Sequence, residues 1–170
     1  MARIGRKGRL WLRAFHISFM GLYIGGVISE SVIIASTGSA QTDGGLQAMY
    51  KIADTLAVVN GPGNIGTLIT GLLLAWLTPW GFFKHKWVIY TLAVVVLLIL
   101  VNFTLDPPLS SKLASLVDAE DLRALQNSEY ISAWNRYVIL RTVLSLLLIS
   151  AAFVSVIKPW EKRKEAEAAS

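Results

Sequence analysis

Four long runs of apolar residues alternate with shorter polar segments along the chain. Each run holds about 20 residues with few or no charges, the length that an α-helix needs to cross the hydrocarbon of a bilayer. Lipid offers no water to unpaired backbone groups, so each run is predicted to be helical. The predicted membrane spans are residues 14–36, 64–80, 87–105 and 133–157.

Two segments between the spans carry an amphipathic pattern. Residues 46–59 have apolar side chains near a helical period and end at the helix-breaking sequence Asn-Gly-Pro-Gly, residues 60–63. They predict a short interfacial helix that turns into the second span. Residues 107–130 place leucines among acidic residues and predict an amphipathic cap over the outer mouth of the bundle. The predicted fold is an all-α, polytopic membrane four-helix bundle with two outer amphipathic segments.

Composition agrees with a chain whose main solvent is lipid. The hydrophobic fraction is 54% and the charged fraction 16%, whereas soluble domains carry about a quarter charged residues. The chain has no cysteine, which excludes disulfides and thiolate metal sites. We expect one four-span domain, residues 1–160, followed by a polar cytoplasmic tail, residues 161–170.

The distribution of Lys and Arg predicts the orientation. The net charge of +5 is concentrated beside the apolar runs, so membrane topology explains it more simply than nucleic-acid binding. The larger basic group flanks the start of span one, the turn between spans two and three, and the end of span four. We therefore expect both termini in the cytoplasm. This group comprises Arg3, Arg6, Lys7, Arg9, Arg13, Lys84, Lys86, Lys158, Lys162, Arg163 and Lys164.

Span one carries two distinct faces. His16, Tyr23 and Glu30 recur every seven residues and so share one face over about 21 Å of helix. This polar face is expected to point into the bundle. A second face carries a row of small residues at spacing four, which predicts close packing of a neighbouring helix. The row consists of Gly21, Gly25 and Ser29.

Glu30 is the costliest residue within the predicted spans. A carboxyl group in lipid is either neutral or paired, and Arg141 of span four lies at a similar depth by residue count. Arg136 lies about one turn nearer the surface. We expect a Glu30–Arg141 pair that joins spans one and four, either as a structural latch or as a proton or anion site.

The two histidines are the candidate cofactor ligands. Imidazole is a frequent haem ligand, and His16 and His85 lie on the same predicted side of the bundle. They predict axial ligation of one haem, with interfacial hydrogen bonding for His16 and a solvated basic turn for His85 as the alternatives. No other metal site, nucleophilic triad or phosphate-binding loop is indicated, so no catalytic residue is assigned.

Short motifs in all four spans resemble one bacterial superfamily. Residues 11–17 with the glycine pair 25–26, residues 61–74, residues 81–87 and the ending 158–160 are similar to its four helices. It includes the four-helix membrane protoporphyrinogen oxidase, the copper-resistance D proteins and an uncharacterised family, which this chain resembles best. The resemblance implies a bacterial inner-membrane protein with a haem-binding role for His16. Lys84 stands where the oxidase has a second histidine.

Three classes of function follow. The leading prediction is a small membrane protein that binds haem b or a related porphyrin for electron or proton transfer. The first alternative is a non-catalytic subunit or scaffold that holds partner helices or a second copy on the Gly21, Gly25 and Ser29 face. The second is a transporter or copper-handling component that uses Glu30 and Arg141. The expected partners are the lipid bilayer and other membrane helices, with no nucleic acid.

Overall fold

The computed structural model describes residues 4–160, apart from the side chain of Ala57, and every regular element in that part is helical. Four of its helical segments are long and apolar enough to cross a membrane, which confirms an all-helical chain with four such segments. Arg3 and the predicted tail, residues 161–170, lie outside the described residues. The elements are α1 (Arg6–Ser36), η1 (Thr37–Ser39), α2 (Asp43–Leu77), α3 (Lys86–Thr104), α4 (Asp106–Glu120), η2 (Asp121–Gln126) and α5 (Ser128–Ile157).

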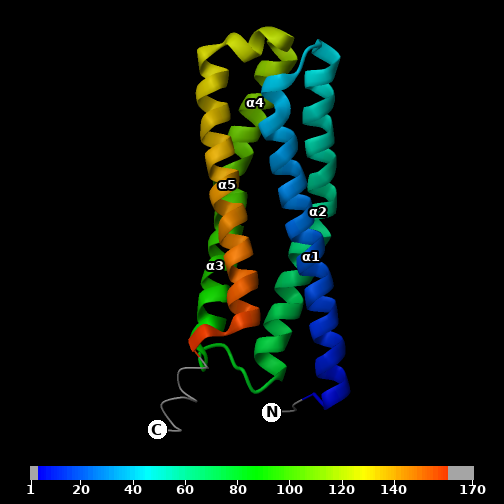
Figure 1. Ribbon diagram of the computed structural model, residues 1–170, viewed down its shortest axis with the longest axis vertical. Coiled ribbons are helices and arrows are strands. Elements are labelled where there is room, and N and C mark those ends of the chain that lie inside the picture. Colours follow the sequence, from blue (N-terminus) through cyan, green and yellow to red (C-terminus); the bar gives the residue numbers. More distant parts are fainter. Residues whose placement is uncertain (1–3, 161–170) are drawn as a thin grey trace.

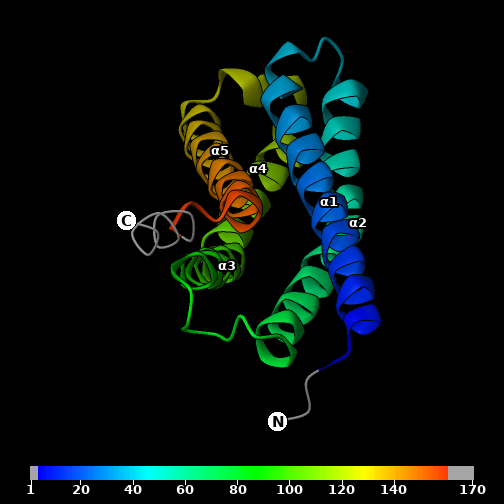
Figure 2. The same ribbon diagram turned by 60° about the horizontal axis from the view of Figure 1, so that its bottom comes forward.

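The helices form an elongated bundle in which α1 begins and α5 ends at the same end, the lower end in Figure 1. α1 packs along α2, α3 packs along α5, and α1 and α5 join the two pairs (Figure 2). The helix starts are specified locally. Thr42 accepts a hydrogen bond from the backbone N–H of Gly45 at the start of α2, and Asn127 accepts one from Glu129 at the start of α5.

α2 is longer than the sequence predicted. The prediction of a separate interfacial helix at residues 46–59 is wrong, because α2 runs unbroken from Asp43 to Leu77 with Pro62 inside it. Proline removes one intrahelical hydrogen bond and favours a bend. The cost is offset by close packing on α1, since a side chain at Gly63 would meet the backbone of Tyr23. Tertiary packing therefore overrides the local break signal.

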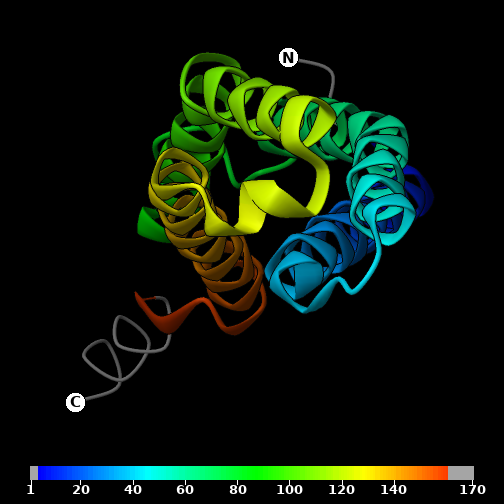
Figure 3. The same cartoon turned by 90° about the horizontal axis from the view of Figure 1, so that it is seen from above.

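The second outer segment also differs from the prediction. α4 does not lie flat as a cap; it continues upward from α3 after a single residue, Leu105. Pro107 and Pro108 occupy the first turn of α4, where no backbone N–H is needed. Leu113 and Val117 are buried in the core cluster of the upper bundle. η2 crosses the upper end from α4 to α5, as Figure 3 shows from above.

Close packing of α1 on α2 uses glycines other than the predicted ones. Gly26 lies against Asn60, and three glycines of α2 lie against α1. By contrast, Gly21, Gly25 and Ser29 are exposed, and added side-chain carbons at the two glycines would meet nothing. The predicted packing face is therefore wrong for contacts within the chain, because the polar face and Gly26 are the ones turned inward. The glycines of α2 in this contact are Gly63, Gly66 and Gly71.

Candidate functional site

A cavity of about 340 Å³ lies between the lower halves of the four long helices. It separates α2 from α3, which do not pack along each other as the other neighbouring helices do. The walls are mainly aliphatic and aromatic side chains. Its charged or hydrogen-bonding lining residues, besides the tryptophans, are Arg13, His16, Thr67, Thr91, Ser155 and Lys158.

The imidazole of His16 is held in one orientation and one tautomer. The Thr70 hydroxyl has a single proton, and its oxygen lies 2.5 Å from the carbonyl oxygen of Gly66, so it donates there. It therefore accepts from His16 Nδ1, which lies 2.9 Å away. The proton of the neutral imidazole is thus on Nδ1, and Nε2 keeps its lone pair.

The packing of the ring sets the direction of that lone pair. An added side-chain carbon at Gly71 would lie 3.1 Å from His16 Cε1, so the Nδ1–Cε1 edge of the ring faces α2. Nε2 is bonded to Cε1 and is the ring nitrogen that Thr70 does not contact. Since His16 lines the cavity, Nε2 is the nitrogen available to a molecule inside it.

The lower rim of the cavity is positively charged and aromatic. The Arg13 guanidinium lies 4.4 Å from the ring centroid of Trp80, and Lys158 Nζ lies 4.7 Å from the same ring. Lys158 Nζ is also 5.0 Å from the ring of Trp87, which meets Trp80 edge-on. Cations and aromatic faces attract one another, so this cluster holds two positive charges at the mouth.

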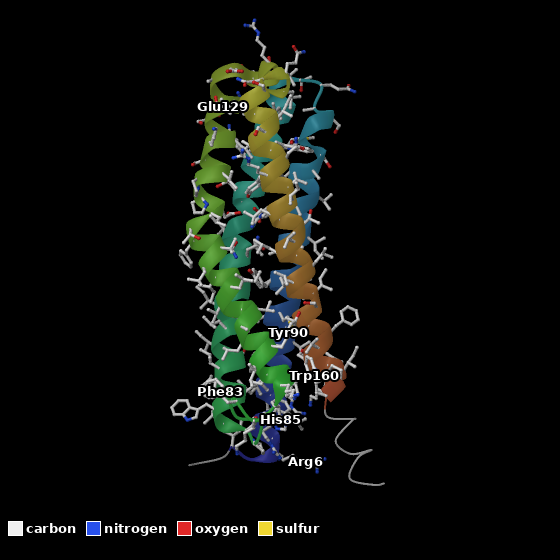
Figure 4. The ribbon with its side chains drawn as sticks, turned by 90° about the vertical axis from the view of Figure 1, so that its left-hand side faces the viewer. Arg6, Phe83, His85, Tyr90, Glu129 and Trp160 are labelled. Atoms are coloured by element: carbon white, nitrogen blue, oxygen red, sulfur yellow. The ribbon has the colours of Figure 1, made fainter. Side chains whose placement is uncertain are left out.

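His85 is not part of this cavity. It precedes α3 as its N-cap, with its ring centroid 6.2 Å from that of Trp87, and Figure 4 shows it at the lower end. The cavity lining includes His16 but not His85. The structure therefore does not bring the two predicted ligands onto one cofactor position. The described residues hold no cluster of three or more His, Asp or Glu suited to a metal ion.

A second polar site lies in the upper half of the bundle. Glu30 and Arg141 form an ion pair there, and their side chains are each 8% exposed. Arg141 also lies 3.3 Å from a carboxylate oxygen of Asp106. Asn60 donates a hydrogen bond of 2.9 Å to the other oxygen of Glu30. We call Glu30, Asn60, Asp106 and Arg141 the charged cluster. Its residues lie on α1, α2, α4 and α5, respectively.

The remaining predicted polar residues divide between inside and outside. Tyr23 is buried on the inner face of α1, between His16 and Glu30 in sequence. Tyr137 of α5 places its hydroxyl 3.5 Å from Glu30. Arg136 is exposed on α5. The structure thus brings Arg141, and not Arg136, to Glu30.

Several residues of both sites are absent from the sequence prediction. Asp106 follows the third apolar run directly, and this position is the signal that could have identified it as a partner for a buried arginine. Asn60 was assigned to a chain break because Gly61, Pro62 and Gly63 follow it. Thr70 carried no signal, because threonine within an apolar helix is common and its partner is decided by packing.

Comparison of this chain with family models, with curated proteins and with solved structures finds no match. The similarity of its short motifs to the four-helix superfamily therefore stays a prediction.

Proposed function

We propose that this chain is an integral membrane protein that crosses the bilayer four times. The support is a belt of exposed apolar side chains around the lower part of the bundle. On α1 the belt extends from Trp11 to Val32, roughly 30 Å of helix and thus close to the thickness of the hydrocarbon. On the other helices it includes Ile65, Ile69 and Trp76 of α2, Val96, Leu100 and Phe103 of α3, and Val143, Leu146 and Phe153 of α5.

The distribution of charge on the same surface supports an orientation in which both termini lie on the cytoplasmic side of a bacterial inner membrane. Basic side chains gather at the lower end, where α1 begins and α5 ends (Figure 1). Above the belt, α4, η2 and the first turns of α2 and α5 carry exposed polar residues, as expected for a part in water. This basic group comprises Arg6, Lys7, Arg9, Arg13, Lys84, Lys86 and Lys158.

For its function we propose the binding of a porphyrin, with haem b as the leading ligand, in the cavity lined by His16. The observation that carries this proposal is the His16 imidazole on the cavity wall with its Nδ1 hydrogen-bonded to Thr70, which leaves Nε2 as the nitrogen for a bond to a metal. A hydrogen bond to the distal nitrogen is how proteins orient a metal-ligating histidine. Haem, when bound, supplies one-electron chemistry at its iron.

The remaining residues around the cavity fit the same class of ligand. A porphyrin is a broad apolar ring with carboxylates at one edge. The aliphatic walls suit the ring, and Arg13 and Lys158 at the lower rim suit the carboxylates. One imidazole lines the cavity, so the residues present fit ligation on one face of the iron.

An absorption spectrum of the detergent-purified protein tests this proposal. Protein produced with ample haem is expected to show a Soret band and sharp bands after reduction with dithionite. His16→Ala is expected to lose them, whereas His85→Ala, which changes the histidine outside the cavity, is expected to keep them. A featureless spectrum of the unaltered protein would refute haem binding.

The alternatives give different results. Stable co-purification with other membrane proteins, without pigment, favours the scaffold, for which the exposed row at Gly21, Gly25 and Ser29 remains free of contacts within the chain. Proton- or copper-dependent flux in liposomes favours the transporter. Neither result is expected if the chain functions as a haem protein alone.

A further inference from the structure

The charged cluster holds more negative than positive charge. Glu30 and Asp106 are both carboxylates, and their recorded ion pairs within residues 4–160 both go to Arg141. With all three groups ionised the cluster has a net charge of −1. Like charges in one buried site cannot both ionise freely, and an uncompensated buried charge is costly. One bound proton makes the cluster neutral.

The groups around the cluster do not supply the missing positive charge. Tyr23 faces it from α1, and Tyr137 from α5; both are phenols, which are neutral when protonated. Asn60 of α2 is an uncharged amide. Further out on α2, Tyr50 is another phenol, and Asp54 is exposed and adds negative charge. The surroundings therefore favour a proton on the cluster.

Hydrogen bonding within the charged cluster is also incomplete. Asn60 Oδ1 and Arg141 Nε are buried without a hydrogen-bond partner, and Asp106 Oδ1 has its 3.3 Å ion pair with Arg141 but no hydrogen bond. Asn60 and Arg141 are each more than nine-tenths buried. An ionised carboxylate only accepts hydrogen bonds, whereas a carboxylic acid also donates one. Protonation of either carboxylate adds a donor to a group that has unused acceptors.

We propose that Glu30 and Asp106 share one exchangeable proton beside Arg141, which makes the charged cluster a proton-loading site. The proton comes from water, forms an O–H bond on one carboxylate, and returns to water when that bond breaks. Asp106 is the point of access, since its side chain is 19% exposed against 8% for Glu30. The site lies apart from the His16 cavity, so it does not depend on any ligand there.

Infrared difference spectroscopy of the intact protein in nanodiscs tests this proposal. Carboxyl groups in water are ionised at pH 7, so the carbonyl stretch of a protonated acid reports buried groups. We expect a band equivalent to one acid per chain that disappears reversibly as the pH is raised. Glu30→Gln and Asp106→Asn are each expected to remove it at pH 7, because one carboxylate then faces one guanidinium. Asp118→Asn, at an exposed position of α4, is expected to leave it unchanged.

Three results would overturn the proposal. The first is the absence of a protonated-acid band in the unaltered protein at pH 7, a measurement that needs no variant to fold. The second is survival of the band in either Glu30→Gln or Asp106→Asn, which would mean that the two carboxylates share no proton. The third is loss of the band at constant pH when sodium replaces choline, which would identify a sodium site.

Discussion

The lower and upper halves of the bundle differ in how their helices pack together. In the lower half, α2 and α3 are held apart and an apolar cavity lies between the helices, with His16 held on its wall by Thr70. In the upper half, residues from four helices meet in the charged cluster. The lower half thus leaves room for a ligand, whereas in the upper half α1, α2, α4 and α5 each contribute one residue to a buried charged cluster. Experiments that damage one half and spare the other test this division.

The largest effect is expected from Arg141→Ala. The change leaves Glu30 and Asp106 facing each other without a cation, and breaking a buried ion pair costs about 3–5 kcal/mol. The free energy of unfolding in mixed micelles measures it. Arg136→Ala, five residues earlier on the exposed side of α5, is expected to change it by less than about 0.5 kcal/mol. Equal losses in the two variants would contradict the assignment of the partner.

Gly63→Ala is expected to destabilise the contact between α1 and α2. Its new side-chain carbon would lie 2.8 Å from the backbone nitrogen of Tyr23, and overpacking of this kind costs roughly 1–3 kcal/mol. Gly25→Ala is the matched control, because nothing lies near the added carbon. It is expected to be neutral or stabilising, since alanine favours helices. A stable Gly63→Ala protein would show that α1 and α2 do not approach so closely.

Thr70→Val is expected to affect only the lower half of the bundle. It removes the oxygen that fixes His16 Nδ1 while keeping the shape of the side chain. Under the proposed function, haem affinity in a titration is expected to fall about 10–100-fold, as for other partners of metal-ligating histidines. The protonated-acid band of the charged cluster is expected to persist. Loss of that band would mean that the two halves are not independent.

Arg13→Gln is expected to have the smallest effect. An exposed cation at the rim contributes about 0.5–1 kcal/mol, so porphyrin binding is expected to weaken only two- to fivefold. That difference should shrink as salt is added. Arg9→Gln, one turn earlier on α1 and outside the cavity lining, serves as the control. An equal loss in both variants would indicate attraction by the whole basic end rather than by the rim.

The sequence predicted the long helices more reliably than it predicted the contacts between them. The four apolar runs predicted the long helices because hydrophobic length is a property of each segment by itself. The face shared by His16, Tyr23 and Glu30 predicted the inner side of α1, since helical periodicity is equally local. Contacts between helices depend on which small residue meets which neighbour, and this explains why Gly26 was missed and why the row at Gly21 makes no contact within the chain.

The continuity of α2 was the least predictable feature. Asn60-Gly61-Pro62-Gly63 is a strong local signal for a turn, and only the tight fit against α1 makes a helix the better solution. The same misassignment concealed Asn60 as a member of the charged cluster. Asp106 was missed for a different reason, because it lies between the third predicted span and the outer segment and was assigned to neither, although it begins α4 directly after α3.

The unbroken course of α2 gives the molecule a mechanical connection along its length. Near the upper end of this helix, Gln47 donates a hydrogen bond of 2.6 Å to Asp121 of η2. Toward the lower end, Thr70 orients the His16 ring. A helix transmits twist along its axis, and Pro62 is the position where this one bends most readily. One continuous helix therefore connects the outer surface at η2 with the residue that orients the imidazole, and Pro62 lies between these two contacts.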